Sequence, residues 1–181
     1  GFLNGALHGN LGNSFVYNIP AIELVIQRLP ATLELAISAL SLAVIIGLPL
    51  GLIAGLYPDS RFSKMIMAGS IVGFSLPTFW VALMLIMTFS VSLGWLPASG
   101  RGQTVEFLGF QWSWLTADGW RHLILPALNL SLFKISLVIR LTRAGVRDVL
   151  PLDFVKFARA KGLSPFRVVC VHVLRLSLIH I

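Results

Sequence analysis

Long stretches without charge constrain this chain more than any other feature. Leu35–Tyr57 contains no charged residue, and Met65–Leu96 is an even longer uncharged run. A helix needs about 20 apolar residues to cross about 30 Å of hydrocarbon, and both runs are long enough. A third apolar segment, Leu123–Ile139, is interrupted only by Lys134. We therefore expect an all-α, polytopic transmembrane helical bundle, with helices at 31–57, 65–96 and 121–142.

The charge balance indicates how such helices are oriented. Only 12% of residues are charged, against about 25% in ordinary soluble domains. The stretch Arg140–Arg175 holds eight of the 14 Lys and Arg residues, and Arg61 and Lys64 lie between the first two apolar runs. Because basic loops stay in the cytoplasm, residues 143–175 are predicted to be cytoplasmic, whereas 1–30 and 97–120 are predicted to be extracytoplasmic. The net charge of +7 is then explained by topology, without nucleic acid as a partner.

Other classes of site receive little support. Cys170 is the single cysteine, which excludes an intrachain disulfide framework, and no Cys/His cluster has the spacing of a zinc site. The histidines His8, His122 and His172 lie outside the three apolar runs, so no catalytic residue and no metal site is expected. Four tryptophans flank the outer loop and are predicted to be interfacial anchors: Trp95, Trp112, Trp114 and Trp120.

The two ends of the sequence suggest an interior segment of a longer protein. An extracytoplasmic start at Gly1 without a signal peptide implies a span upstream, and the chain becomes apolar again from Phe166. We also hypothesise that residues 176–181 are not native protein, because their sequence can be encoded by a transposon end used in DNA library preparation.

Small and polar residues inside the spans are candidates for helix packing or for a translocation path. Glycines recur at four-residue spacing, which permits close helix contacts, and generic packing is the simpler interpretation. The candidates are Gly47, Gly51, Gly55, Gly69, Gly73, Ser75 and Pro77.

Lys134 is the basic residue well inside a predicted span. Lys134 precedes Arg140 by six residues, which is about 9 Å along a helix. Its long side chain can therefore extend its amine to the cytoplasmic interface. A structural role is favoured over an ion or substrate role, and Glu34 is expected to lie at too different a depth to pair with it. The alternative function is a stand-alone channel or secondary carrier that uses Lys134 as its intramembrane charge.

The cytoplasmic stretch contains a short amphipathic helix, predicted over residues 153–163. Phe154, Phe157, Ala158 and Lys161 recur three or four residues apart, and Gly162 suits the position after the helix. A short helix projecting from a membrane bundle can dock onto a soluble partner. The alternative is a basic helix that lies on anionic lipid, and composition does not separate the two.

These residues resemble the permease subunits of bacterial ABC importers, in the dipeptide and oligopeptide branch. That family carries a cytoplasmic EAA loop with a fixed glycine, which Gly162 matches. The run from Ala158 to Leu163, Ala-Arg-Ala-Lys-Gly-Leu, and His172-Val173-Leu174-Arg175 resemble the branch-specific form of this loop. Further similar stretches include Leu29-Pro30-Ala31-Thr32-Leu33-Glu34-Leu35 and Ser75-Leu76-Pro77-Thr78-Phe79-Trp80.

The resemblance implies a fold of six spans, of which three are present here, and a subunit without chemistry of its own. It implies a second permease subunit, two cytoplasmic ATPase subunits and an extracytoplasmic solute-binding protein as partners, in the bacterial inner membrane. ATP and Mg²⁺ are expected on the partner ATPase, because no G-x-x-x-x-G-K-[ST] loop occurs in this chain. The transported solutes are expected to be peptides or similar small molecules. The residues implied to couple to the ATPase are Phe154, Lys156, Phe157, Ala158, Arg159, Ala160, Lys161, Gly162 and Leu163.

Overall fold

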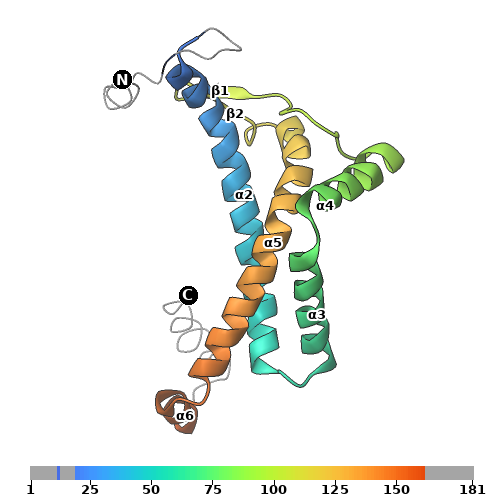
Figure 1. The fold of residues 1–181 in the computed structure, drawn as a ribbon. Helices are drawn as coiled ribbons and strands as arrows, with labels where there is room; N and C mark the ends of the chain where they lie inside the picture. The colour runs from blue at the N-terminus through green and yellow to red at the C-terminus, as the bar shows by residue number, and fades with distance from the viewer. Residues whose placement is uncertain (1–11, 13–18, 162–181) are drawn as a thin grey trace. The chain divides into compact units, whose positions relative to one another are not determined.

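The described structure, a computed structural model, comprises residue 12 and residues 19–161. It is mainly helical, which confirms the predicted class, and it adds one small hairpin that the sequence did not suggest (Figure 1). In chain order the elements are α2 (Ala21–Leu56), α3 (Arg61–Ser75), α4 (Thr78–Leu85), the π-helix η1 (Ile86–Ser92), β1 (Val105–Phe107), β2 (Phe110–Trp112), α5 (Ala117–Val149) and α6 (Asp153–Ala160).

The chain forms two compact units. Of the described residues above 18, the first unit holds 19–38 and 86–126, and the second holds 39–85 and 127–161. The first unit contains the start of α2, the π-helix η1, the hairpin and the start of α5. The second contains the rest of α2 and α5 together with α3, α4 and α6.

Two of the described helices, α2 and α5, are long and apolar enough to cross a membrane alone. The predicted helix at 65–96 is instead a bent pair, because Arg61–Ser75 and Thr78–Ser92 meet at an angle of 102°. Pro77 explains this difference. Proline lacks an amide hydrogen and disfavours helical backbone in the residue before it, and Leu76 is extended, with φ −76° and ψ 133°.

Both long helices extend beyond the predicted bounds. α2 begins at Ala21, directly after Pro20, so Pro30 lies inside the helix and does not start it. α5 begins at Ala117, where the Thr116 hydroxyl accepts a hydrogen bond from the Gly119 amide at 2.9 Å, as an N-cap does. It continues to Val149, seven residues past the predicted end, and stops before Pro151.

Three helices meet in the second unit. Ala54 of α2, Ile66 of α3 and Ile139 of α5 form one buried apolar cluster. The Ser63 hydroxyl, 1% exposed, donates to the Ala54 carbonyl at 3.1 Å and so joins α3 to the end of α2. These contacts place the segments of α2, α3 and α5 in this unit side by side (Figure 1).

The hairpin belongs to the first unit. β1 and β2 are antiparallel, with Val105 opposite Trp112 and Phe107 opposite Phe110. The two residues of the turn, Leu108 and Gly109, both have positive φ, at 55° and 79°. This is the backbone of a type I′ turn, in which a glycine is favourable and a leucine is uncommon. The sequence analysis missed the hairpin because the usual Asn-Gly or Asp-Gly signal is absent.

Candidate functional site

Val155 packs the short helix α6 against α5 within the second unit. Val155 is 0% exposed and packs in an apolar cluster with Val146 and Val149 of α5. Leu52 and Leu56, at the end of α2, contact the same cluster. Val155 therefore contacts the ends of two long helices.

The opposite side of α6 is exposed. Phe157 follows Val155 by two residues, which is about 200° around a helix, and its side chain is 62% exposed. The Lys161 ammonium lies 4.7 Å from the centre of the Phe157 ring, and Lys156 is paired with Asp153 at 2.9 Å. The exposed face thus combines a large apolar ring with the basic side chains of Lys156 and Lys161.

The predicted coupling residues are only partly visible in the structure. Lys156, Phe157 and Ala160 are exposed on α6, and Lys161, directly after it, is exposed too. Gly162 and Leu163 lie outside the described residues, as do His172–Arg175, and the structure describes no side-chain surroundings for Phe154, Ala158 and Arg159. Sequence reasoning missed Val155, although an apolar residue flanked by Phe154 and Lys156 is a weak signal of a second, inward face.

The glycine row (Gly47, Gly51 and Gly55) packs closely against α5. A methyl group placed on these residues lies 2.8, 2.6 and 2.7 Å from the Cβ atoms of Val138, Thr142 and Val146, respectively. Real Cβ atoms essentially never approach so closely, so glycine is required for this helix contact. Packing between α2 and α5 is therefore the role of the glycine row in this structure.

The other small residues behave differently from one another. Gly73 also packs closely, because an added Cβ lies 2.8 Å from Ser136 Oγ of α5, whereas Gly69 has nothing within 4 Å. The described residues thus show a close contact at Gly73, and a packing role for Gly69 stays a prediction. The Ser75 hydroxyl donates to the Ile71 carbonyl at 2.8 Å, and Pro77 marks the bend after α3.

Lys134 and Arg140 are basic side chains within α5. Lys134 is half-buried and has neither a hydrogen-bond nor an ion-pair partner among residues 19–161. Arg140 is also half-buried, and its guanidinium lies 4.2 Å from the centre of the Phe74 ring. Phe74 in turn stacks on Phe133, with ring centres 4.6 Å apart.

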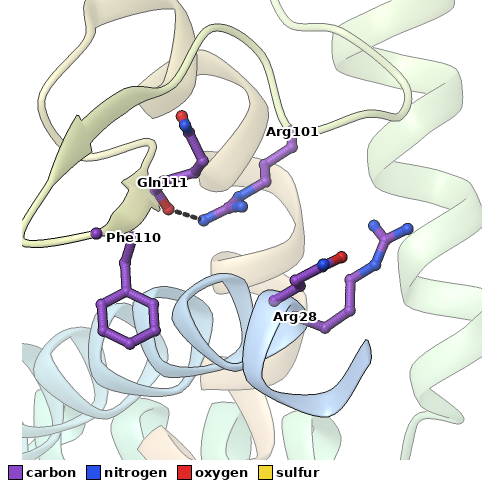
Figure 2. Close-up of a pocket in the computed structure, with 6 residues that line it drawn as sticks. Arg28, Arg101, Phe110 and Gln111 are labelled. Carbon is purple, nitrogen blue, oxygen red and sulfur yellow. Dashed lines mark hydrogen bonds between the residues drawn. The ribbon is translucent and has the colours of Figure 1, made fainter. Parts of the chain in front are cut away.

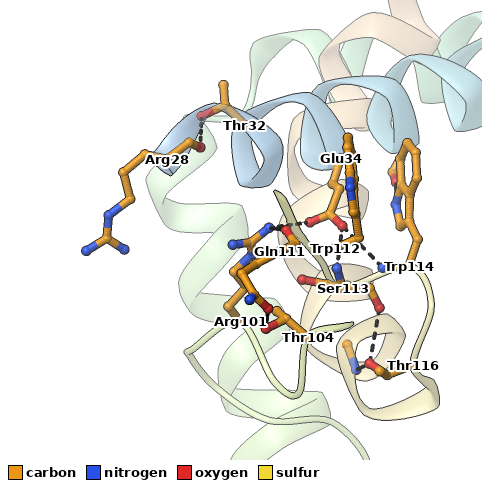
Figure 3. Close-up of polar contacts among 12 residues, drawn as sticks. Arg28, Thr32, Glu34, Arg101, Thr104, Gln111, Trp112, Ser113, Trp114 and Thr116 are labelled. Atoms are coloured by element: carbon orange, nitrogen blue, oxygen red, sulfur yellow. Dashed lines mark hydrogen bonds and ion pairs between the residues drawn. The ribbon is translucent and has the colours of Figure 1, made fainter. Parts of the chain in front are cut away.

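A buried carboxylate organises the first unit, as Figure 3 shows. Glu34 is 1% exposed, and its Oε2 accepts a hydrogen bond from Arg101 Nη2 at 3.2 Å. Its Oε1 accepts from the backbone amides of Ser113 and Trp114, the latter at 3.2 Å. Arg101 also donates to the Gln111 carbonyl. Through Arg101, Ser113 and Trp114, Glu34 of α2 binds both the loop before the hairpin and the segment after it.

This network was not predicted, because in the sequence Glu34 was notable only as a distant partner for Lys134. Two of the predicted interfacial tryptophans also take part in contacts within the first unit. The rings of Trp112 and Trp114 stack at 6.2 Å, and Trp114 Nε1 donates to Ser38 Oγ at 3.3 Å. Their role as membrane anchors remains a prediction.

A small open pocket of about 320 Å³ lies beside this network (Figure 2). Gln27, Arg28, Arg101, Gly109, Phe110 and Gln111 line it. Two arginines line the pocket. Arg101 is already paired with Glu34, so the pocket retains the charge of Arg28. Across the described part of the chain, no group of three His, Cys, Asp or Glu side chains converges as metal ligands do.

The chain is similar to a known protein family and to several curated proteins. Residues 47–181 match the family described as binding-protein-dependent transport system inner membrane component. The chain is 42% identical to the di/tripeptide transport system permease protein DppB of Pseudomonas aeruginosa (strain UCBPP-PA14), over 98% of this chain and 56% of that protein.

Two proteins of Escherichia coli (strain K12) are also similar. The putrescine export system permease protein SapB is 37% identical, over 98% of this chain and 60% of that protein. The dipeptide transport system permease protein DppB is 36% identical, over 96% of this chain and 56% of that protein. The chain thus spans little more than half the length of these curated relatives.

Proposed function

Because this chain belongs to the family of binding-protein-dependent transport system inner membrane components, we propose that it is part of the membrane path of an ATP-driven importer. We further propose that α6 couples this path to a partner ATPase. The observation that carries the proposal is the two-sided packing of α6, in which Val155 is buried against α5 and α2 while Phe157 is exposed. The family match, residues 47–181, includes α6.

The proposed mechanism is mechanical. Closure of the ATPase moves α6 through contacts with Phe157 and the neighbouring basic groups. Because Val155 packs against Val146 and Val149 and the ends of α2, this displacement is passed to the spans. A change between outward-open and inward-open arrangements needs two discrete packings of the helices, each favoured by a different state of the ATPase.

The proposed assembly contains a second permease subunit, two cytoplasmic ATPase subunits and an extracytoplasmic solute-binding protein. ATP and Mg²⁺ bind to the ATPase subunits, which carry out the hydrolysis. Two of the relatives are named for di/tripeptide or dipeptide transport, and a third is named for putrescine export. These names support peptides as the first solute class to test, with other small solutes next.

The comparisons favour this function over a stand-alone channel or secondary carrier, because the relatives named above are permease subunits. Lys134, which has no partner among residues 19–161, is the feature that the alternative would use, and it is compatible with either function.

Removal of the exposed ring of α6 tests the coupling. We expect Phe157→Ala to weaken association of the full permease with its ATPase about tenfold or more, as loss of an aromatic anchor does at an interface. Phe107→Ala is the matched control. Phe107 is similarly exposed, at 58%, but it lies on the hairpin, in a segment that is predicted to be extracytoplasmic. The measurement is co-purification of the ATPase at graded concentrations, with membrane insertion checked in parallel.

Two outcomes would count against the proposal. Equal ATPase association in Phe157→Ala and Phe107→Ala would remove the docking role of α6. Unchanged ATPase association, together with weaker binding of Phe157→Ala to vesicles that contain anionic lipid, would instead support the lipid-surface interpretation of the helix.

A further inference from the structure

The guanidinium of Arg140 lies deep among the membrane helices. Gly47 and Gly51 of α2 pack against Val138 and Thr142, so the Cα of Arg140 is level with residues 47–51 of α2. Phe74, whose ring the guanidinium contacts, follows Met65, where the second predicted span begins, by nine residues along α3. That separation is about 14 Å along the helix, in a hydrocarbon layer of about 30 Å.

A charge at this depth requires a polar neighbour. None of the three ion pairs in the described part of the chain includes Arg140. The side chain is half-buried, so part of it faces outside this unit. Exposure of a guanidinium to lipid tails is costly, and such groups face a water-filled cavity or a polar group instead.

The contact with Phe74 leaves the hydrogen-bonding edge of Arg140 available. An arginine that lies over an aromatic ring uses its flat face, and its N–H groups point outward in the plane. These N–H groups match the two oxygens of a carboxylate, which they bind in a bidentate manner. Phe74 and Phe133, 41% and 42% exposed, provide an apolar surface beside this edge.

We propose that Arg140 is a solute-binding residue of the translocation path, where its guanidinium receives the carboxylate of the transported molecule while Phe74 and Phe133 contact its apolar part. This inference rests on the proposed transport function and deepens it. It assigns the path a preference for carboxylate-bearing solutes, such as peptides with a free C-terminus. Lys134, about 9 Å farther along α5 and about 120° around it, is not required for this site.

The test uses the full permease reconstituted in vesicles with its partner permease, ATPases and solute-binding protein. A dipeptide and its C-terminal amide are compared, with a pair chosen so that both forms saturate the binding protein. We expect Arg140→Gln to lower the maximal uptake rate of the free dipeptide about tenfold and that of the amide less than twofold. Arg140→Lys should recover only part of the loss, because it restores the charge but not the bidentate edge of the guanidinium.

Arg147→Gln is the control, since Arg147 is exposed near the cytoplasmic end of the same helix. An equal loss for both peptides in Arg140→Gln, or no loss for either, would overturn the proposal. Loss of the partner permease from the complex would also overturn it, by showing that Arg140 pairs with a subunit. Absence of ATP-driven peptide uptake by the unmutated complex would overturn the proposed function itself, and the carboxylate site with it.

Discussion

The closest helix contact in the second unit yields a quantitative prediction. A methyl group on Gly51 lies 2.6 Å from Thr142 Cβ and 2.9 Å from the Ile139 carbonyl oxygen. Carbon atoms in contact normally stay about 3.5–4.0 Å apart, so Gly51→Ala requires α2 and α5 to separate locally by about 1 Å. Such overpacking costs about 1–3 kcal/mol, and the better helix propensity of alanine returns up to about 1 kcal/mol.

Because one of the contacted atoms is backbone and cannot rotate away, we expect the upper part of that range. The net loss in the free energy of unfolding should be about 1–2 kcal/mol. Gly69→Ala is the matched control, since Gly69 has nothing within 4 Å, and it should be neutral or stabilising by up to about 1 kcal/mol.

The assay is reversible unfolding in mixed detergent micelles, followed by circular dichroism. The expected difference between the two alanine variants is about 1–3 kcal/mol. Equal free energies of unfolding for Gly51→Ala and Gly69→Ala would refute the claim that the glycine row is required for close contact between α2 and α5.

Three further predictions concern the other sites. Glu34→Gln should raise amide hydrogen exchange at Ser113 and Trp114 about tenfold or more, because charge-assisted bonds are worth about 1.5–3 kcal/mol; unchanged exchange would refute this. Val155→Ala should loosen α6 by about 1–2 kcal/mol through lost packing, measured as faster proteolysis within residues 153–160, and an unchanged cleavage rate would contradict the buried anchor. Gly162→Asp should leave the subunit inserted but impair uptake, and normal ATPase association with normal transport would argue against docking by this loop.

Local sequence patterns predicted much of the helical fold. The apolar runs located α2 and α5, because membrane spans are specified mainly by length and apolarity. The four-residue spacing of Gly47, Gly51 and Gly55 indicated a close contact, and the structure identifies α5 as the partner helix. Helix ends were less predictable, because Pro20 and Pro30 both precede apolar residues and either one suits the start of a helix.

Features built from distant parts of the chain were not predictable in this way. Glu34 binds Arg101 and Ser113, which follow it by 67 and 79 residues. No local pattern pairs an acid with backbone amides so far away. Arg140 was counted with the cytoplasmic charges, and only its packing on Phe74 reveals its depth. Val155 was missed because the sequence pattern emphasised the phenylalanines on either side of it.

The central claim, that α6 contacts a partner ATPase through one side while the other side packs on the membrane helices, is tested most directly by photocrosslinking in the intact complex. A photoreactive residue is placed at position 157 or at position 155. The account predicts crosslinks from position 157 to the ATPase and crosslinks from position 155 only within the permease chain. Crosslinks to the ATPase from position 155, or none from position 157 in an actively transporting complex, would contradict it.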